Sequence, residues 1–327
     1  RSSACTWSPG EWMPRRRPFN RPDKVKTHMQ SIARRIIYAP PVNLVIRTTL
    51  RPFRTMLPAS LKIPVAGSIR VDTEVNGSIV LATNQTCYLT KRLFWDGVKG
   101  YEYPSLRVFR DLIRAQRCFL DVGASIGYYS LMAARINPRV QVFAFEPMPS
   151  AYAFLVRNIA LNGFEENIHA VRMALGDSSG EVEFFASRNP KAAYLKHHLG
   201  GASSMAGAED EYAEAISVTI ARLDDFVDQH AVGPVGIMKL DTEATEDRVL
   251  LGAEMTVKRD RPFILCEVLP GRIEPELEAF FRANGYVFYL PGTEGLRSVG
   301  TIIEHKDSTD FLFVHESRLS EISHLTL

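Results

Sequence analysis

Two apolar runs of the sequence end in acidic residues of the kind that hold nucleosides. The first leads into F-L-D-V-G-A-S-I-G-Y-Y-S at 119–130, which contains Asp121 and two glycines, Gly123 and Gly127. The second is F-A-F-E-P at 143–147, which puts Glu146 after another expected strand. Ligands of open α/β sheets bind at the carboxyl ends of strands, and glycines let them approach the backbone. Glu146 is therefore placed to hold both hydroxyls of a ribose.

The spacing and charge of the glycine turn distinguish between classes of nucleoside ligand. Dinucleotide sites use G-x-G-x-x-G and leave a helix N-terminus free for the pyrophosphate. Here the spacing is G-x-x-x-G, and the Asp121 carboxylate would repel pyrophosphate. The same carboxylate suits S-adenosyl-L-methionine, which carries ammonium and sulfonium groups and no phosphate. We expect this cofactor, with a nicotinamide-dependent oxidoreductase as the alternative.

A third acidic stretch, G-I-M-K-L-D-T-E-A-T-E-D at 236–247, follows another expected strand. If extended backbone continues, strand alternation puts Lys239, Asp241 and Glu243 on one side, at the sheet edge where the first two motifs end. The two carboxylates then form an acidic pocket facing the sulfonium and the methyl acceptor. The alternative is an ordinary Lys239–Asp241 ion pair, with Thr245 capping the next helix.

The elements that must position these motifs form an α/β pattern. Short apolar runs alternate with helical patterns after residue 117, which is typical of a parallel sheet covered by helices on both faces. Strands are expected at 118–122, 140–145, 168–174, 236–240, 263–268, 286–290 and 311–314. Helices are expected at 131–136, 151–161, 246–257 and 274–283. Upstream, the pattern predicts a hairpin over 68–89 that turns at Asn76-Gly77, and a helix over 104–115.

Composition separates a basic beginning from an acidic remainder. The chain has 327 residues and a net charge of +2, yet residues 1–70 hold 14 Lys and Arg against Glu11 and Asp23. We expect 1–60 to be a partly disordered extension with a short basic amphipathic helix from Lys24, suited to packing or to peripheral membrane contact. The hairpin region 61–117, the catalytic domain 118–317 and a tail at 318–327 follow.

Several classes of protein are disfavoured. The longest apolar stretches are too short to span a membrane, and no interleaved aromatics suggest a nucleic-acid surface, so a cytoplasmic protein is expected. The four cysteines form no cluster, and His197 and His198 have no third ligand at metal spacing, so no metal site is expected. The long segment 187–215 is expected to form a loop over the acceptor.

Many ordered motifs across residues 61–316 give the chain a family resemblance. They are W-D-G-V-K-G-Y-E from 95, D-V-G-A-S-I-G-Y-Y-S from 121, F-E-P-M-P from 145, N-I-A-L-N from 158, A-L-G-D from 174, G-A-S-S-M from 201, L-D-D-F from 223, K-L-D-T-E from 239 and F-I-L-C-E-V from 263. The sequence resembles the FkbM family of S-adenosylmethionine-dependent methyltransferases. The resemblance implies a class I methyltransferase fold, a Rossmann-like, doubly wound, seven-stranded sheet whose last strand is antiparallel.

The resemblance also implies roles for individual residues. Ser125 belongs to the cofactor turn, Glu102 either reaches the cofactor or caps its helix, and Asp177 lies where class I enzymes place an adenine contact. Several members methylate hydroxyls of polyketides or saccharides, so a small-molecule or saccharide acceptor is expected, with Asp241 or Glu243 as its base. Two departures stand out: Ser125 replaces a usual Asn, and Ala244-Thr245 replaces a usual Gly-Ala. The second keeps a cofactor-binding protein without catalysis as an alternative.

Overall fold

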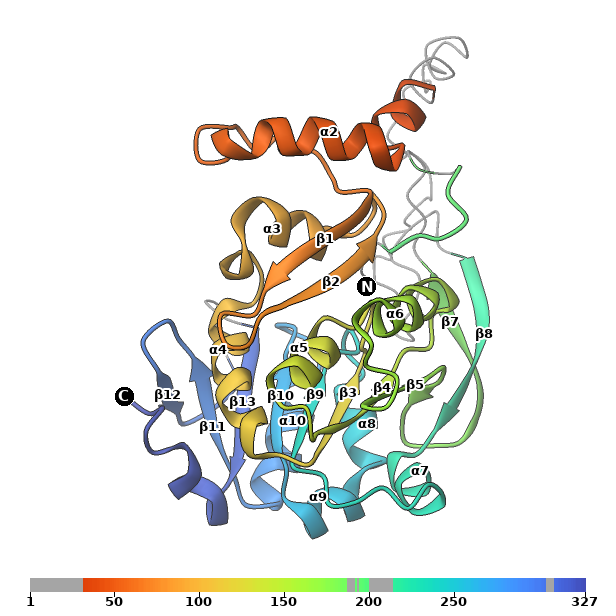
Figure 1. The fold of residues 1–327 in the computed structure, drawn as a ribbon. Coiled ribbons are helices and arrows are strands. Elements are labelled where there is room, and N and C mark those ends of the chain that lie inside the picture. The colour runs from red at the N-terminus through yellow and green to blue at the C-terminus, as the bar shows by residue number, and fades with distance from the viewer. Residues whose placement is uncertain (1–31, 187–191, 193, 200–213, 304–308) are drawn as a thin grey trace, which may run out of the picture. The chain divides into compact units, whose positions relative to one another are not determined.

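The computed structural model describes residues 32–186, 192, 194–199, 214–303 and 309–327 (Figure 1). The chain divides into two compact units, residues 1–37 and 38–327. In the first unit, the described residues 32–37 are helical, and the earlier part of the helix expected from Lys24 lies outside the described residues. The second unit contains every other element below. It includes α2 (Pro40–Leu50), which the sequence assigns to the extension.

An eight-stranded sheet forms the centre of this unit, in the order β12-β11-β13-β10-β9-β3-β4-β5. The strands are β3 (Cys118–Val122), β4 (Gln141–Phe145), β5 (Ile168–Val171), β9 (Ile237–Leu240), β10 (Phe263–Glu267), β11 (Tyr286–Pro291), β12 (Leu296–Val299) and β13 (Asp310–His315). β3, β4, β5, β9 and β10 run parallel, whereas β13 is antiparallel to both of its neighbours. All seven expected strands are present, so the class I fold is confirmed. β12 is an additional short edge strand that the sequence did not reveal.

Helices cover both faces of the sheet because strand residues alternate between two apolar layers. Phe119 packs with one layer and the next residue, Leu120, with the other. The first layer includes α4 (Tyr103–Leu112), α5 (Tyr128–Ile136) and α6 (Pro149–Asn162). The second includes α7 (Leu223–Gln229), α8 (Glu246–Leu251), α9 (Glu254–Asp260) and α10 (Glu274–Ala283). The sheet is thus buried on both sides, and its strand ends are what remain open to ligands.

One expected helix is divided in two, which is a correction to the sequence reading. The pattern predicts a continuous helix over 246–257, but α8 and α9 are separate and Gly252 lies between them. A Cβ at Gly252 would lie 1.9 Å from the carbonyl oxygen of Gly176. The break lets the backbone pass close to the residue that follows the short strand Ala174–Leu175.

Two smaller sheets flank the central one. β1 (Gly67–Asp72) and β2 (Ser78–Thr83) form the expected hairpin, with Gly77 at a φ of 73° in its turn. A helix, α3 (Tyr88–Asp96), follows the hairpin. The sequence analysis had predicted that the second strand would continue to residue 89, which is wrong. The other sheet has the order β6-β8-β7 and consists of β6 (Ala174–Leu175), β7 (Gly180–Ala186) and β8 (Glu214–Ala221).

Candidate functional site

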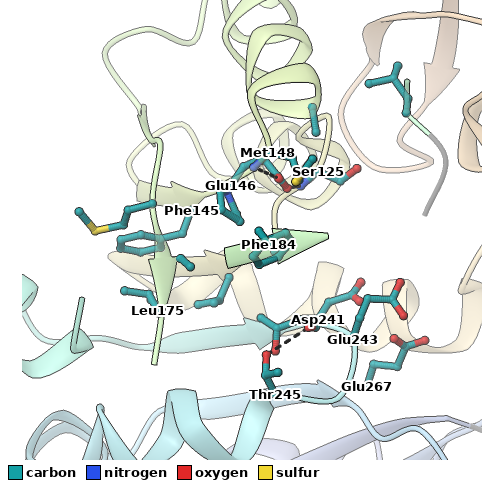
Figure 2. Close-up of a pocket in the computed structure, with 18 of the residues that line it drawn as sticks. Ser125, Phe145, Glu146, Met148, Leu175, Phe184, Asp241, Glu243, Thr245 and Glu267 are labelled. Carbon is teal, nitrogen blue, oxygen red and sulfur yellow. Dashed lines mark hydrogen bonds between the residues drawn. The ribbon is translucent and has the colours of Figure 1, made fainter. Parts of the chain in front are cut away.

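A cavity lies at the carboxyl ends of β3, β4, β9 and β10, where the motifs converge (Figure 2). Its lining is Tyr101, Val122, Gly123, Ser125, Phe145, Glu146, Pro147, Met148, Ala151, Met173, Ala174, Leu175, Phe184, His198, Leu199, Asp241, Thr242, Glu243, Thr245 and Glu267. Four of these described residues are acidic and none is Lys or Arg. The cavity therefore favours a cationic or neutral ligand and disfavours a phosphate.

The glycine turn joins β3 to the neighbouring strands. The backbone N–H groups of Gly123 and Ala124 donate to the carbonyl oxygen of Phe145, at 3.0 and 2.9 Å. Gly123 has a φ of 82°, and a Cβ there would lie 1.8 Å from the carbonyl oxygen of Asp241. Only glycine satisfies both conditions. The turn thus brings the backbone after β3 against the backbone after β9.

Glu146 is held in place by backbone donors. Its side chain is buried and accepts hydrogen bonds from the N–H groups of Ser125 and Met148, both at 2.8 Å. Burial raises the pKa of this carboxyl to about 7, although the two hydrogen bonds act in the opposite direction. Each carboxylate oxygen can accept a further hydrogen bond. Glu146 is therefore fixed at the cavity wall and retains capacity for a ligand with two hydroxyl donors.

At the end of β9, Lys239 and Asp241 form the ion pair that the sequence left as an alternative. The Nζ atom of Lys239 lies 2.6 Å from Oδ2 of Asp241 and 4.0 Å from Oε2 of Glu102. The same atom lies 4.7 Å from the ring centroid of Tyr129. Burial lowers the pKa of Lys239, but these carboxylates outweigh it and hold the pKa well above its ordinary value. A buried lysine thus fixes Asp241 while Asp241 still lines the cavity.

The backbone after β9 does not remain extended. The strand alternation from which the position of Glu243 was predicted is therefore wrong. The strand ends at Leu240, and Glu243 and Ala244 have φ values of 58° and 71°. Glu243 nevertheless lines the cavity together with Asp241. Thr245 occupies the N-cap position of α8 without a side-chain cap, because its hydroxyl donates to the carbonyl oxygen of Thr242 at 3.1 Å.

Glu267 is a cavity residue that the sequence analysis missed. It is the last residue of β10, in the strand next to β9, and its side chain hydrogen-bonds with Asp241. Burial raises the pKa of Glu267 to about 9, and the negative charge of Asp241 adds to the increase. The strand-end rule that selected Glu146 applies equally to F-I-L-C-E-V, and it would have found this carboxyl.

Comparison with known proteins shows the family of this chain. Residues 121–288, which run from the first acidic motif into β11, match the model of the methyltransferase FkbM domain. The chain belongs to the FkbM methyltransferase family. The chain is 30% identical over 153 residues to a 31-O-demethyl-FK506 methyltransferase FkbM from Streptomyces tacrolimicus, covering 41% of this chain and 58% of that protein. It therefore spans little more than half the length of that relative.

Other relatives and solved structures are more distant. A 2-O-methyltransferase NoeI from Sinorhizobium fredii is 26% identical over 185 residues, covering 54% of this chain and 74% of that protein. A methyltransferase sdnD from Sordaria araneosa is 26% identical over 187 residues, covering 51% of this chain and 72% of that protein. A crystal structure of a methyltransferase FkbM from Methylobacillus flagellatus is 14% identical, with a TM-score of 0.38, covering 65% of this chain and 53% of that one.

Four predicted cofactor residues of this FkbM-family chain are not among those that line the cavity. Asp121 is buried and accepts hydrogen bonds from the N–H and hydroxyl of Ser130, at 3.0 and 2.5 Å, which ties β3 to the first turn of α5. Burial raises its pKa to about 6. Gly127 has a φ of 91°, and a Cβ there would lie 2.6 Å from Leu155. Both residues shape the turn from behind the cavity wall.

The other two residues lie elsewhere around the strands. Glu102 accepts a hydrogen bond from the hydroxyl of Tyr129 at 2.9 Å and occupies the N-cap position of α4 without a side-chain cap. Asp177 is exposed in a turn, where it accepts a hydrogen bond from the Ser178 hydroxyl at 3.2 Å. Of the nine predicted site residues, the structure therefore brings five to the cavity: Gly123, Ser125, Glu146, Asp241 and Glu243.

Both departures from the family pattern occur at positive φ. Ser125 has a φ of 50°, a conformation that Asn tolerates better than most residues. Ala244, where the resemblance implies glycine, has a φ of 71°. The backbone thus keeps the shape that the usual residues would allow, at a conformational cost of roughly 1 kcal/mol for a residue with a Cβ. Residues other than the usual ones support the same turns.

The segment expected to lie over the acceptor is described only in part. Residues 187–191, 193 and 200–213 lie outside the described residues. In the described part, His198 and Leu199 line the cavity, and the N–H of Leu199 donates to the Thr86 hydroxyl at 2.7 Å. Within the described residues, no cluster of His, Cys, Asp or Glu has the geometry to hold a metal ion.

Proposed function

We propose that this chain is an S-adenosylmethionine-dependent O-methyltransferase that acts on a hydroxyl of a small molecule or saccharide. The observation that carries the proposal is the acidic cavity at the strand ends, with four carboxyl side chains and no Lys or Arg among its described lining residues. When bound, S-adenosylmethionine supplies a methyl group on a positively charged sulfur. A cavity of this charge suits that cation and would repel the pyrophosphate of a nicotinamide dinucleotide.

The residues at one end of the cavity fit the nucleoside part of this cofactor. Glu146 presents a carboxylate whose position two backbone N–H groups fix, and charge-assisted hydrogen bonds from ribose hydroxyls would complete its bonding. Phe145 and Leu175 lie at the same end in Figure 2 and offer apolar surface to the adenine base. Gly123 leaves its backbone open to close approach. The fit rests on this chain's own geometry.

The residues at the other end fit a hydroxyl acceptor. Asp241, Glu243 and Glu267 lie together in Figure 2, each at the end of β9 or β10. As the acceptor oxygen forms its new bond to carbon, its proton must leave, and a neighbouring carboxylate can take it. Asp241 is held by Lys239, and Glu267 shares a hydrogen bond with it. We assign Asp241 or Glu243 as the base and Glu267 as the residue that positions Asp241.

The printed names of two relatives support methylation at oxygen. The protein from Streptomyces tacrolimicus is named a 31-O-demethyl-FK506 methyltransferase, and the one from Sinorhizobium fredii is named a 2-O-methyltransferase. Each names an oxygen as the methylated atom. A hydroxyl acceptor agrees with the carboxylates at the end of β9, because a proton acceptor is what a hydroxyl nucleophile requires.

Titration calorimetry followed by turnover tests the proposal. The chain should bind S-adenosylmethionine with saturable heat and show no heat with NAD. A panel of polyols and saccharides should then include an acceptor whose mass rises by one methyl group. Binding of NAD in preference to S-adenosylmethionine would overturn the proposal. Binding without methylation of any acceptor would instead favour the cofactor-binding protein without catalysis, which the non-glycine residue Ala244 at positive φ keeps open.

A further inference from the structure

Helix α2 buries two polar residues against the rest of the chain. Asn43 and Arg47 are buried at 0% and 2% exposure. The Asn43 amide donates to the carbonyl oxygen of Pro64 at 3.1 Å and accepts from the N–H of Ala66 at 2.8 Å. The Arg47 guanidinium donates to the carbonyl oxygen of Ser68 at 2.6 Å. These side chains bind the helix to the backbone at the start of β1.

The same segment also exposes several large apolar side chains. Six large hydrophobic side chains between Val42 and Leu61 are exposed, by 37% to 82%, and we call them the α2 face: Val42, Leu44, Val45, Phe53, Met56 and Leu61. They are six of the 17 exposed large hydrophobic residues in the described chain, within 20 positions. Exposed apolar residues scattered singly are ordinary, but a cluster of this kind marks an interaction surface.

The charged residues of the segment that carries the α2 face have one sign. Arg51 and Arg54 follow the helix and are exposed, and no Asp or Glu occurs between Asp23 and Asp72. The Arg51 guanidinium stacks over the ring of Phe94 at 5.2 Å. A segment that combines exposed apolar side chains with arginines and lacks acidic residues is complementary to anionic lipid headgroups above hydrocarbon. A symmetric pair of chains would instead bring arginines against arginines.

We infer that the α2 face docks on an anionic lipid surface. The apolar side chains enter the boundary between headgroups and acyl chains, and Arg51 and Arg54 contact lipid phosphates. The helix lies in the plane of the interface, because within the described residues no helix has the length and apolarity to cross a bilayer. The inference is independent of the cofactor, since the α2 face shares no residue with the cavity.

Vesicle sedimentation of the full chain tests the inference. The protein should sediment with vesicles of phosphatidylcholine mixed with phosphatidylglycerol and remain in solution with phosphatidylcholine alone. The double variant Val45→Asp, Met56→Asp should bind the anionic vesicles at least about tenfold more weakly. Arg51→Gln and Arg54→Gln should each weaken binding about fivefold, equivalent to about 1 kcal/mol per charge. Circular dichroism should show all of these variants folded, since the residues are exposed.

A matched pair of substitutions provides the control. Leu251 and Met255 are exposed by 51% and 60% on α8 and α9, at the end of the molecule opposite α2 in Figure 1. Leu251→Asp, Met255→Asp should leave vesicle binding unchanged. Equal loss in this control, or equal binding to neutral vesicles, would overturn the inference. So would light scattering that shows a dimer which Val45→Asp, Met56→Asp dissociates, because a second copy would then cover the α2 face.

Discussion

The two ends of the cavity are built in different ways. At the end that we propose holds the nucleoside, called the nucleoside end, Glu146 is oriented by two backbone N–H groups, and the glycine turn has no room for a side chain. At the end that we propose faces the acceptor, called the acceptor end, Asp241 is oriented by the side chain of Lys239 and hydrogen-bonded with the carboxyl of Glu267. The loop that carries Glu243 contains consecutive non-glycine residues at positive φ.

This difference suggests that the fold fixes the geometry of the nucleoside end, whereas the geometry of the acceptor end can vary with its side chains. Backbone donors belong to the fold itself, so the nucleoside end needs only glycines and one carboxylate at defined positions. Side-chain pairs depend on charge and protonation, and a substitution changes them without changing the fold. The acceptor end is thus the part in which single substitutions should alter activity most without changing the fold.

Asp241→Asn should give the largest effect, at the acceptor end alone. Loss of a general base typically lowers turnover by about 10² to 10⁴. Asp247→Asn is the matched control, because Asp247 lies in the first turn of α8 and is not among the lining residues. Initial methylation rates with a hydroxyl acceptor measure the effect. A rate within a few-fold of the unaltered protein would show that Asp241 is not the base and leave Glu243 in that role.

Gly123→Ala should damage the turn that supports the nucleoside end. The added Cβ would meet the carbonyl oxygen of Asp241, and overpacking of this kind lowers the free energy of unfolding by about 1–3 kcal/mol. Gly163→Ala isolates the backbone contribution, because Gly163 has a φ of 67° and no atom within 4 Å of the added Cβ. Its cost should be about 1 kcal/mol. Urea unfolding measures the loss of unfolding free energy in both variants. Equal losses would exclude the close approach of Gly123 to the Asp241 carbonyl as the cause.

Glu267→Gln should change how stability depends on pH. Folding raises the pKa of this carboxyl from about 4.5 to about 9, so its contribution to stability is complete below about pH 4.5 and is lost as pH rises to about 9. The variant should therefore become progressively more stable than the unaltered protein across this range. Unfolding midpoints at several pH values measure the difference, and the exposed Glu276→Gln is the control. A difference independent of pH would contradict the coupling between the half-buried carboxyls of Asp241 and Glu267.

Ala244→Gly should give the smallest effect and stabilise the protein. Glycine adopts a φ of 71° without the steric cost of a Cβ, so the free energy of unfolding should rise by at most about 1 kcal/mol. Ala231→Gly is a matched control at a φ of 48°, outside the cavity lining. Both should raise the unfolding midpoint, whereas only Ala244→Gly should alter the KM for the acceptor. An identical KM in both variants would show that this backbone does not contact the acceptor.

The sequence predicted the sheet well, because strands follow from short-range patterns, but only three of its seven predicted cofactor residues line the cavity. Strand 118–122 matches β3 at both ends, and helix 274–283 matches α10. An apolar run that is followed by a glycine turn leaves few alternatives to a buried strand. Glu146 was identified by its place at a strand end, and the same place for Glu267 was overlooked. β12 was missed because four residues, Leu296–Val299, carry too little pattern to distinguish a strand from a loop.

The acceptor end was harder to predict because its geometry depends on contacts between distant residues. The prediction continued strand alternation past Leu240, but the strand ends there and the backbone turns. The burial of Asn43 and Arg47 in α2 could not be predicted for a similar reason, since their hydrogen bonds go to the distant carbonyl oxygens of Pro64 and Ser68. Such pairings over 21 positions have no local signature.

The affinity of two matched variants for S-adenosylmethionine tests the division of the cavity most directly. Titration calorimetry of Glu146→Ala should show a loss of about 1–3 kcal/mol in binding free energy, from charge-assisted hydrogen bonds to the ribose. Asp241→Asn should bind the same ligand within a few-fold of the unaltered protein. Unchanged affinity in Glu146→Ala, or a parallel loss of affinity and turnover in Asp241→Asn, would contradict the assignment of one end to the cofactor and the other to the acceptor.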